Sequence, residues 1–399
     1  MGANKTNQII LRPRKEESLK RFHPWVFSGA IAKTGQGIQE GDIVRVFSAS
    51  GEFLGVGHYQ VGSISVRILS FTDETINEDF YARRISSAYR MRMKIGLLHA
   101  GNNTFRLIHG EGDHLPGLII DMYGKTAVVQ AHSVGMDGDK EKIVDALQRV
   151  LGKDNLENIF YKSEGTLPFK AGIEADNDYL LGGQNVDPVA LENGLRFNID
   201  WLRGQKTGFF IDQRENRLLL EKYAAGKDVL NMFCYTGGFS VYALRGGARS
   251  VHSVDSSAKA VSLTDENIRL NFGEEPRHTS FSEDAFKFLK ASTANAYDLI
   301  VLDPPAFAKH RGAISNALQG YKRLNLAALE KIKQEGILFT FSCSQAINKE
   351  QFRLAVFSAA AISGRKVSIL HQLTQPADHP INIYHPEGEY LKGLVLFVE

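Results

Sequence analysis

Two strand-like runs end in residues that can do chemistry. Asp303 follows the apolar run 298–302, and Cys343 comes shortly after the apolar run 337–341. Helix-like sequence follows each run, which is typical of parallel strands in an open α/β sheet, where ligands bind at the carboxyl ends of the strands. We therefore expect a carboxylate and a thiol to lie together at one sheet edge, as they would in an enzyme.

The thiol is the more informative of the two groups. The chain has only two cysteines, Cys234 and Cys343, which excludes a disulfide framework and a cysteine-rich zinc site. We expect Cys343 to be partly exposed beside positive groups that lower its thiol pKa. Cys234 lies beside the expected cofactor turn and more plausibly lines that pocket. The twelve histidines show no metal-binding spacing in the sequence, so no metal site is expected.

A glycine-containing turn at 234–240 follows a third apolar strand, 229–233. It matches neither a dinucleotide fingerprint nor a P-loop, which indicates a nucleoside-like cofactor without phosphate. Asp255 ends the next strand and could accept both ribose hydroxyls, and Asp284 follows the strand after that, where it could hold an adenine amino group or cap a helix. The glycine-containing turn together with Asp255 and Asp284 predicts that the cofactor is S-adenosylmethionine. Its expected pocket residues are Gln213, Arg214, Phe233, Tyr235, Thr236, Gly237, Asp255, Ser256, Asp284, Ala285 and Asp303.

The sequence divides into three expected domains. Short glycine-punctuated strands over 7–72 predict a small β-barrel, and mixed patterns over 73–184 predict a central α+β domain. Strands alternating with helices over 185–399 predict a Rossmann-like doubly wound α/β domain of seven strands, whose last two can pair antiparallel at one edge. Asp212 and Glu215 have the spacing of a capping box for a helix beginning near Gln213.

Composition agrees with a globular chain: 43% of the residues are hydrophobic and 23% are charged. No apolar run is long enough for a membrane span and no secretory signal is present, so we expect a cytoplasmic protein with no membrane partner. The net charge of +2 is small, but basic residues cluster near the start and again over 83–94. Around 12–27 they accompany an aromatic residue, a mixture that can bind RNA. The residues concerned are Arg12, Lys20, Arg21 and Trp25.

Residues 204–217, 231–239, 303–307 and 342–344 resemble those of bacterial large-subunit rRNA cytosine-5 methyltransferases, a class I S-adenosylmethionine-dependent family. Residues 12–69 resemble the family's RNA-binding PUA domain. The resemblance implies that ribosomal RNA is the partner and that Cys343 adds to carbon 6 of a cytosine, with Asp303 as the base or as a group that orients the base. A homodimer is possible, but the oligomeric state is not determined by the sequence. RNA contacts are also expected from Lys206, Pro304, Pro305, Phe307 and Lys309.

Two other functions stay open. An Asp-Pro-Pro-aromatic motif also suits methylation of a guanine ring nitrogen, which needs no cysteine nucleophile. A non-catalytic RNA-binding assembly factor could keep the fold without transferring a methyl group. Loss of activity on Cys343→Ala separates the first alternative from carbon methylation, and binding of S-adenosylmethionine separates the second.

Overall fold

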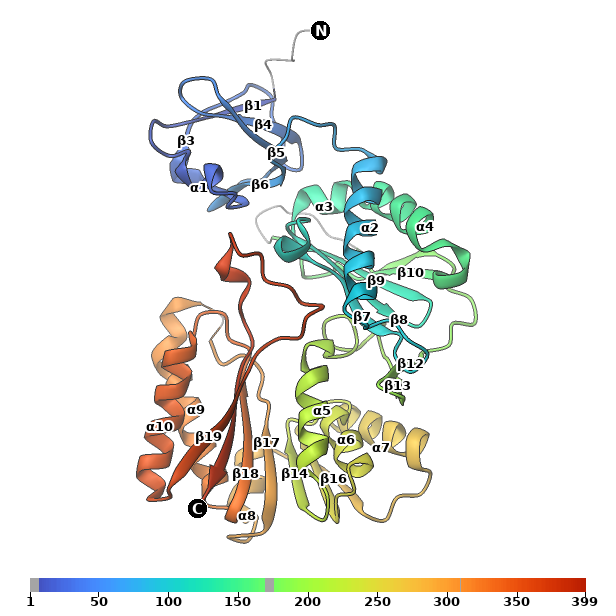
Figure 1. The fold of residues 1–399 in the computed structure, drawn as a ribbon, viewed down its shortest axis with the longest axis vertical. Helices are drawn as coiled ribbons and strands as arrows, with labels where there is room; N and C mark the ends of the chain where they lie inside the picture. Colours follow the sequence, from blue (N-terminus) through green and yellow to red (C-terminus); the bar gives the residue numbers. More distant parts are fainter. Residues whose placement is uncertain (1–6, 169–175, 309) are drawn as a thin grey trace. The chain divides into compact units, whose positions relative to one another are not determined.

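A computed structural model describes residues 7–168, 176–308 and 310–399 of the chain (Figure 1). The fold divides into two compact units, each described by itself below. Unit 1 contains Met1–Gly194, Ile199–Ile211 and Ala377–Gly388, and unit 2 contains Leu195–Asn198, Asp212–Pro376 and Glu389–Glu399. Unit 1 thus includes a segment from near the carboxyl terminus. No helix among the described residues is long and apolar enough to cross a membrane.

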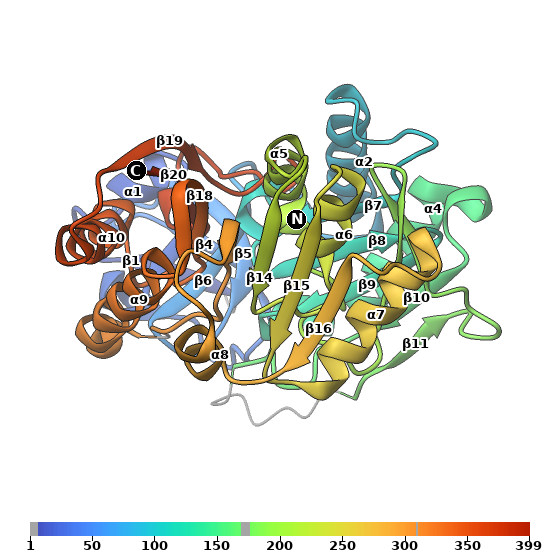
Figure 2. The same ribbon diagram turned by 90° about the horizontal axis from the view of Figure 1, so that it is seen from below.

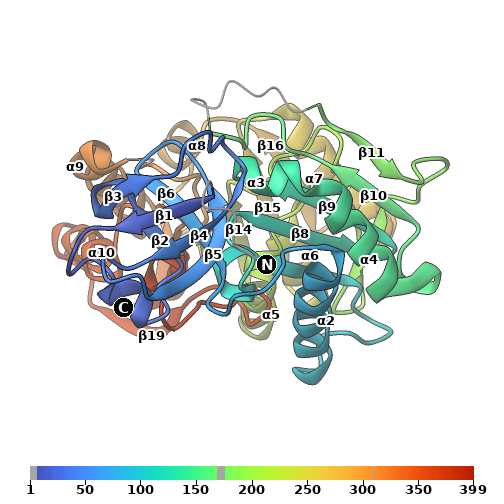
Figure 3. The same cartoon turned by 90° about the horizontal axis from the view of Figure 1, so that it is seen from above.

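The amino-terminal part of unit 1 is a six-stranded sheet with the order β2-β6-β5-β4-β1-β3, seen in blue in Figure 3. Alternate side chains of its strands, such as Val44 and Val46 in β4, are buried in a small core of their own. The predicted short strands are present. The elements are β1 (Gln8–Leu11), α1 (Glu17–Lys20), β2 (Trp25–Phe27), β3 (Ile31–Thr34), β4 (Ile43–Phe47), β5 (Phe53–Tyr59) and β6 (Ile64–Ser70).

The central part of unit 1 is a five-stranded sheet with the order β11-β10-β9-β8-β7, packed with helices α2 and α4 around a second core. Helix α2 begins after Asn77, whose side chain accepts a hydrogen bond from the Phe80 amide. The elements are α2 (Glu78–Lys94), β7 (Thr104–His109), β8 (Leu118–Tyr123), β9 (Thr126–Ala131), α3 (Val134–Gly138), α4 (Lys140–Asn155), β10 (Asn158–Tyr161), β11 (Asp178–Leu181) and β12 (Val189–Glu192).

Unit 2 is built on a seven-stranded sheet with the order β16-β15-β14-β17-β18-β20-β19. The first five strands in this order are parallel, and β20 runs antiparallel to both of its neighbours. Its strands are β14 (Asp228–Met232), β15 (Ser250–Asp255), β16 (His278–Ser282), β17 (Tyr297–Leu302), β18 (Ile332–Ser342), β19 (Val367–Leu373) and β20 (Lys392–Val398); β13 (Leu195–Asn198) precedes them. The seven-stranded α/β prediction is confirmed.

Helices cover both faces of this sheet (Figures 1 and 2). Helices α5, α6 and α7 are neighbours on one face, and α8, α9 and α10 are neighbours on the other. Because both faces are covered, consecutive residues of a central strand can be apolar and buried rather than alternating, as in 299–302 of β17. The helices are α5 (Arg214–Tyr223), α6 (Gly238–Arg245), α7 (Ala258–Phe272), α8 (Ala285–Ala291), α9 (Ile314–Leu329) and α10 (Lys349–Ser363).

Candidate active site

The strand order brings Asp303 and Cys343 together. Strands β17 and β18 are parallel neighbours, with Leu302 opposite Thr340, so both motifs leave the sheet at the same edge. The Cys343 Sγ atom lies 4.0 Å from the carbonyl oxygen of Pro304. Pro304 is buried and Pro305 is exposed. The fold therefore places the Asp303 and Cys343 motifs at one sheet edge, as expected.

The pKa of the Asp303 carboxyl group lies near physiological pH. Burial and then the negative charge of Asp212 raise its pKa from 3.8 to about 7, against a hydrogen bond from Gln213 and the positive charge of Arg217. A carboxyl group with such a pKa can exchange a proton near neutral pH. Asp303 can therefore act as an acid or as a base.

The environment of Cys343 differs from the one expected. Burial, followed by the charges of Asp303 and Asp212, raises the pKa of the thiol to about 12. The prediction of a lowered pKa is wrong, because the thiol is largely buried and its main charged neighbours are carboxylates. Lys392 opposes them only weakly. Its Nζ atom donates hydrogen bonds to the carbonyl oxygens of Ser344 (2.7 Å) and Ile347 (2.8 Å).

Asp212 is a site residue that the sequence did not identify as one. The predicted capping box is wrong: α5 begins at Arg214 and no side chain caps it. Instead, Asp212 Oδ2 accepts a hydrogen bond of 2.7 Å from the hydroxyl of Tyr390, and Oδ1 is buried with no hydrogen-bond partner among the described residues. The charge of Asp212 acts on both Asp303 and Cys343. Its spacing to Glu215 gave no sign of this role.

The loop between β14 and α6 has an unusual backbone. Phe233, Tyr235 and Gly237 have φ angles of 60°, 48° and 78°, so left-handed residues alternate along the loop. Such conformations cost energy and are found where a loop is shaped for a ligand. A Cβ atom on Gly237 would lie 2.6 Å from Cγ2 of Thr264, so only glycine fits there. Helix α7 supports the loop through Thr264, whose hydroxyl donates to the Tyr235 carbonyl at 2.9 Å.

Cys234 also contacts Thr264, the residue of α7 that supports this loop. Its sulfur lies 3.5 Å from Oγ1 of Thr264, and the side chain is 5% exposed. Burial is the main cause that raises its pKa to about 12. Cys234 is therefore more enclosed than Cys343, which is partly exposed.

The expected ribose and adenine carboxylates lie on consecutive strands of the sheet. Asp255 ends β15 and accepts hydrogen bonds from the amides of Tyr235 (3.1 Å) and Ser257 (2.9 Å). Asp284 follows β16, is exposed, and caps α8 by accepting from the Phe286 and Lys287 amides at 3.1 Å each. The carboxyl ends of β14, β15 and β16 are adjacent in the sheet, so the loop and both carboxylates can contact one nucleoside.

The other predicted cofactor residues have less direct support. Gln213 and Arg214 are buried, and Oε1 of Gln213 accepts from Asn216 at 2.6 Å. Thr236 is also buried, and its carbonyl accepts from Asn267 at 2.9 Å. Ser256 is exposed and Ala285 is buried at the start of α8. Their contacts with a cofactor stay predictions.

The predicted RNA contacts fall into exposed and packed residues. Arg12, Arg21 and Lys206 are exposed, and Lys20 is exposed but paired with Glu52 at 2.7 Å. Trp25 is half-buried, with its ring 4.2 Å from that of His385 and its Nε1–H donating to Glu111. Not every basic residue over 83–94 can contact RNA, because Arg92 is fully buried in an ion pair with Asp113.

Two further predicted contacts lie just after Pro305. The Phe307 ring packs 4.6 Å from the ring of Tyr321, so Phe307 is already partly buried within unit 2. Lys309 lies outside the described residues. RNA contact by either residue stays a prediction.

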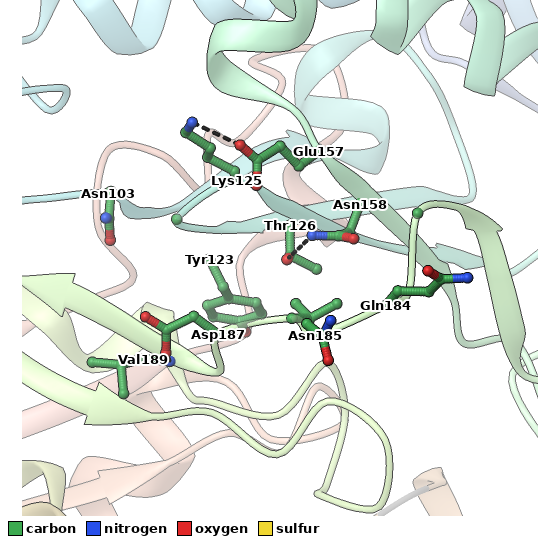
Figure 4. Close-up of a pocket in the computed structure, with 13 residues that line it drawn as sticks. Asn103, Tyr123, Lys125, Thr126, Glu157, Asn158, Gln184, Asn185, Asp187 and Val189 are labelled. Carbon is green, nitrogen blue, oxygen red and sulfur yellow. Dashed lines mark hydrogen bonds and ion pairs between the residues drawn. The ribbon is translucent and has the colours of Figure 1, made fainter.

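Unit 1 also contains an open cavity of about 680 Å³, shown in Figure 4. Its wall includes an ion pair between Lys125 and Glu157 and a hydrogen bond from Asn158 to Thr126. None of the predicted catalytic, cofactor or RNA-binding residues lines it. It therefore gives no support to the expected chemistry.

Comparisons with known proteins agree with this architecture. Residues 106–382 match the family described as S-adenosylmethionine-dependent methyltransferase, and residues 9–71 match the PUA-like domain. Relatives named ribosomal RNA large subunit methyltransferase I, from Alteromonas mediterranea and Pseudoalteromonas atlantica, are each 38% identical. They cover 97% and 98% of this chain and 98% and 99% of their own lengths, respectively.

A solved structure of a SAM-dependent methyltransferase from Streptococcus mutans has the same fold. It has a TM-score of 0.83 and 24% identity, and covers 98% of this chain and 100% of its own. A second structure with the same scores, titled as a methyltransferase, contains SAH.

Proposed function

Because the chain belongs to the S-adenosylmethionine-dependent methyltransferase family, we propose that it methylates carbon 5 of a cytosine in large-subunit ribosomal RNA through a transient bond to Cys343. The observation that carries this proposal is the position of the Cys343 thiol, partly exposed and 4.0 Å from the Pro304 carbonyl, directly beside Asp303. The names of the relatives and the PUA-like domain support ribosomal RNA as the substrate. A homodimer stays a prediction.

The loop 233–237 and the carboxylates of Asp255 and Asp284 would hold the cofactor, since they follow the carboxyl ends of three adjacent strands. When bound, S-adenosylmethionine supplies an electrophilic methyl group and a positive charge. The loop is preformed for this role, because its left-handed residues and the close packing of Gly237 on Thr264 fix the backbone.

Carbon 5 of cytosine becomes nucleophilic only after a sulfur atom has added to carbon 6. Cys343 must therefore lose its proton in a site where burial and two carboxylates oppose a further negative charge. Transfer of the thiol proton to Asp303 moves the charge from oxygen to sulfur without adding a new one. Asp303, with a pKa of about 7, is suited to take this proton.

Protonated Asp303 then has a hydrogen-bond donor that it can offer to the pyrimidine. After carbon 5 has received the methyl group, a base removes the proton from this carbon, the ring double bond re-forms, and the bond between Sγ and carbon 6 breaks. Asp303 and Asp212 are the two carboxylates that act on the thiol. Asp212 can receive this proton, while protonated Asp303 returns the first proton to the released Cys343 thiolate. The proton taken from carbon 5 then leaves Asp212 for solvent, which restores the starting charge of the site.

The test is covalent trapping with an RNA that contains 5-fluorocytidine. Fluorine at carbon 5 cannot leave as a proton does, so the enzyme stays bonded to carbon 6 after methylation. We expect the wild-type chain to form a denaturation-resistant complex in the presence of S-adenosylmethionine. Cys343→Ser should form none, and Cys234→Ser is the matched control that should still be trapped.

The result also separates the alternatives. Turnover of ordinary RNA by Cys343→Ala would rule out carbon methylation through this thiol and favour attack by a ring nitrogen. A wild-type chain that binds RNA but neither binds S-adenosylmethionine nor transfers its methyl group would instead be an assembly factor.

A further inference from the structure

Three potential metal ligands meet in unit 1, outside the proposed active site. His23 lies between α1 and β2, and His385 and Glu387 lie in the segment Ala377–Gly388, which belongs to the same unit. One nitrogen of each imidazole and a carboxylate oxygen all lie within 4.8 Å of one another. Among the described residues, this is the group of histidines and acids with the geometry of a metal site.

The distances within the group fit an ion better than direct hydrogen bonds. Nε2 of His23 lies 3.5 Å from Oε1 of Glu387, and Nε2 of His385 lies 3.7 Å from Oε2. Both separations exceed the usual 2.7–3.2 Å of an N–H···O hydrogen bond. Two ligands that bind one tetrahedral zinc ion at about 2.0–2.1 Å are roughly 3.4 Å apart. The two gaps, one to each Glu387 oxygen, are therefore close to the spacing of ligands that share one ion.

His385 provides the second, independent observation. Its side chain is 2% exposed, yet neither ring nitrogen has a hydrogen-bond partner among the described residues. A buried polar group without a partner is costly, and such groups normally indicate a bound water, ion or ligand. The Trp25 ring packs on the imidazole at 4.2 Å and is itself fixed by a 2.9 Å hydrogen bond to Glu111. The imidazole is thus held in place facing Glu387.

We propose that His23, His385 and Glu387 bind one zinc ion, with water completing a tetrahedral site. Imidazole nitrogens favour zinc over magnesium or calcium, and two histidines with one glutamate form a known zinc ligand set. Binding through Nε2 of His23 places the proton on Nδ1, which gives up the long 3.3 Å contact from the Trp25 amide. The ion fastens the segment Ala377–Gly388 to the turn that precedes β2.

The test uses the full-length chain without an affinity tag, stripped with a chelator and dialysed against zinc chloride. We expect one zinc per chain by elemental analysis, and visible absorption typical of tetrahedral cobalt when Co²⁺ replaces it. His385→Gln and Glu387→Gln should lose at least tenfold in zinc affinity. His99→Gln removes an exposed histidine of the same unit and should bind as the wild type does, as should Cys343→Ser.

A second measurement covers the case in which His385→Gln disturbs folding. In the wild type, zinc should slow amide hydrogen exchange in Ala377–Gly388, and in the folded Glu387→Gln variant it should not. The proposal is overturned if the wild type binds no stoichiometric zinc. It is equally overturned if Glu387→Gln keeps the wild-type affinity and protection, or if His99→Gln loses as much as the site variants. None of these readouts depends on methyltransferase activity.

Discussion

Removing the charge of Asp303 should make Cys343 more reactive and the enzyme less active. Burial and then the Asp303 carboxylate raise the pKa of the thiol from its ordinary 9.0 to about 12. Asp303→Asn removes the larger of the two carboxylate contributions while keeping the shape of the side chain. The thiolate should therefore form more readily in the variant, although the variant has lost the group that we propose takes the proton.

The size of the effect follows from the chemistry of thiols. For each unit by which the pKa falls, the thiolate fraction at pH 8 rises about tenfold, while lower nucleophilicity takes back roughly threefold, so the net gain is about threefold. Asp303→Asn should thus speed alkylation of Cys343 by roughly threefold to tenfold. The same substitution should slow methylation by about 10² or more, as loss of an acid–base group does.

The assay is the rate of iodoacetamide labelling at each cysteine, followed by peptide mass spectrometry in the absence of RNA and cofactor. Cys234 is the internal reference, because it is 5% exposed and far less accessible to the reagent. Asp212→Asn should give a smaller increase than Asp303→Asn, since Asp303 is the larger electrostatic cause. An unchanged or slower labelling rate of Cys343 in Asp303→Asn would refute the electrostatic account.

Two more outcomes follow from the site. Gly237→Ala should weaken S-adenosylmethionine binding by roughly tenfold in calorimetry, because the new Cβ would meet Thr264 at 2.6 Å. Gly226→Ala has a similar φ of 68° but nothing within 4 Å, and should leave affinity unchanged. The raised pKa of Asp303 means that the folded chain keeps a proton that the unfolded chain loses between pH 3.8 and about 7. The stabilisation of the folded chain by this proton is therefore fully present below pH 3.8. It is lost as pH rises to 7, which lowers the free energy of unfolding by up to about 4 kcal/mol. Urea unfolding at pH 5 and pH 7 should show about 2 kcal/mol of this loss in the wild type, and a matching loss in Asp303→Asn would contradict it.

The strands of unit 2 could be predicted because each one corresponds to a short continuous pattern in the sequence. Buried parallel strands are short apolar runs, and all seven expected runs are strands in the structure. The antiparallel pairing of the last two was also correct, since no α-helix separates β19 from β20. The order of the strands then fixes which chain segments share an edge. Asp303 and Cys343 were found in this way, 40 residues apart but both directly beyond strand ends.

The capping box failed because local spacing does not show which partner a side chain takes. Asp212 and Glu215 have the right separation, but the Asp212 carboxylate instead accepts from Tyr390, 178 residues later. The direction of the Cys343 pKa failed for a related reason. The sequence places a thiol at the sheet edge, but only the fold shows that the thiol is buried and that carboxylates outweigh Lys392 there.

The partners of the segment Ala377–Gly388 could not be predicted from local sequence either. It follows β19 in the sequence, yet its side and main chains complete a buried charge network in unit 1. Arg92 binds both carboxylate oxygens of Asp113 and the carbonyl of Asp378 (2.8 Å), while the Asp378 carboxylate accepts from the Arg106 amide at 2.9 Å. Buried charges without partners are strongly destabilising, so Arg92 requires these acceptors. Nothing in the local sequence around Arg92 or Asp378 reveals that need, since residues 286 positions apart satisfy it. The same long-range contacts bring His385 and Glu387 to His23, so histidine spacing along the chain could not indicate the proposed metal site.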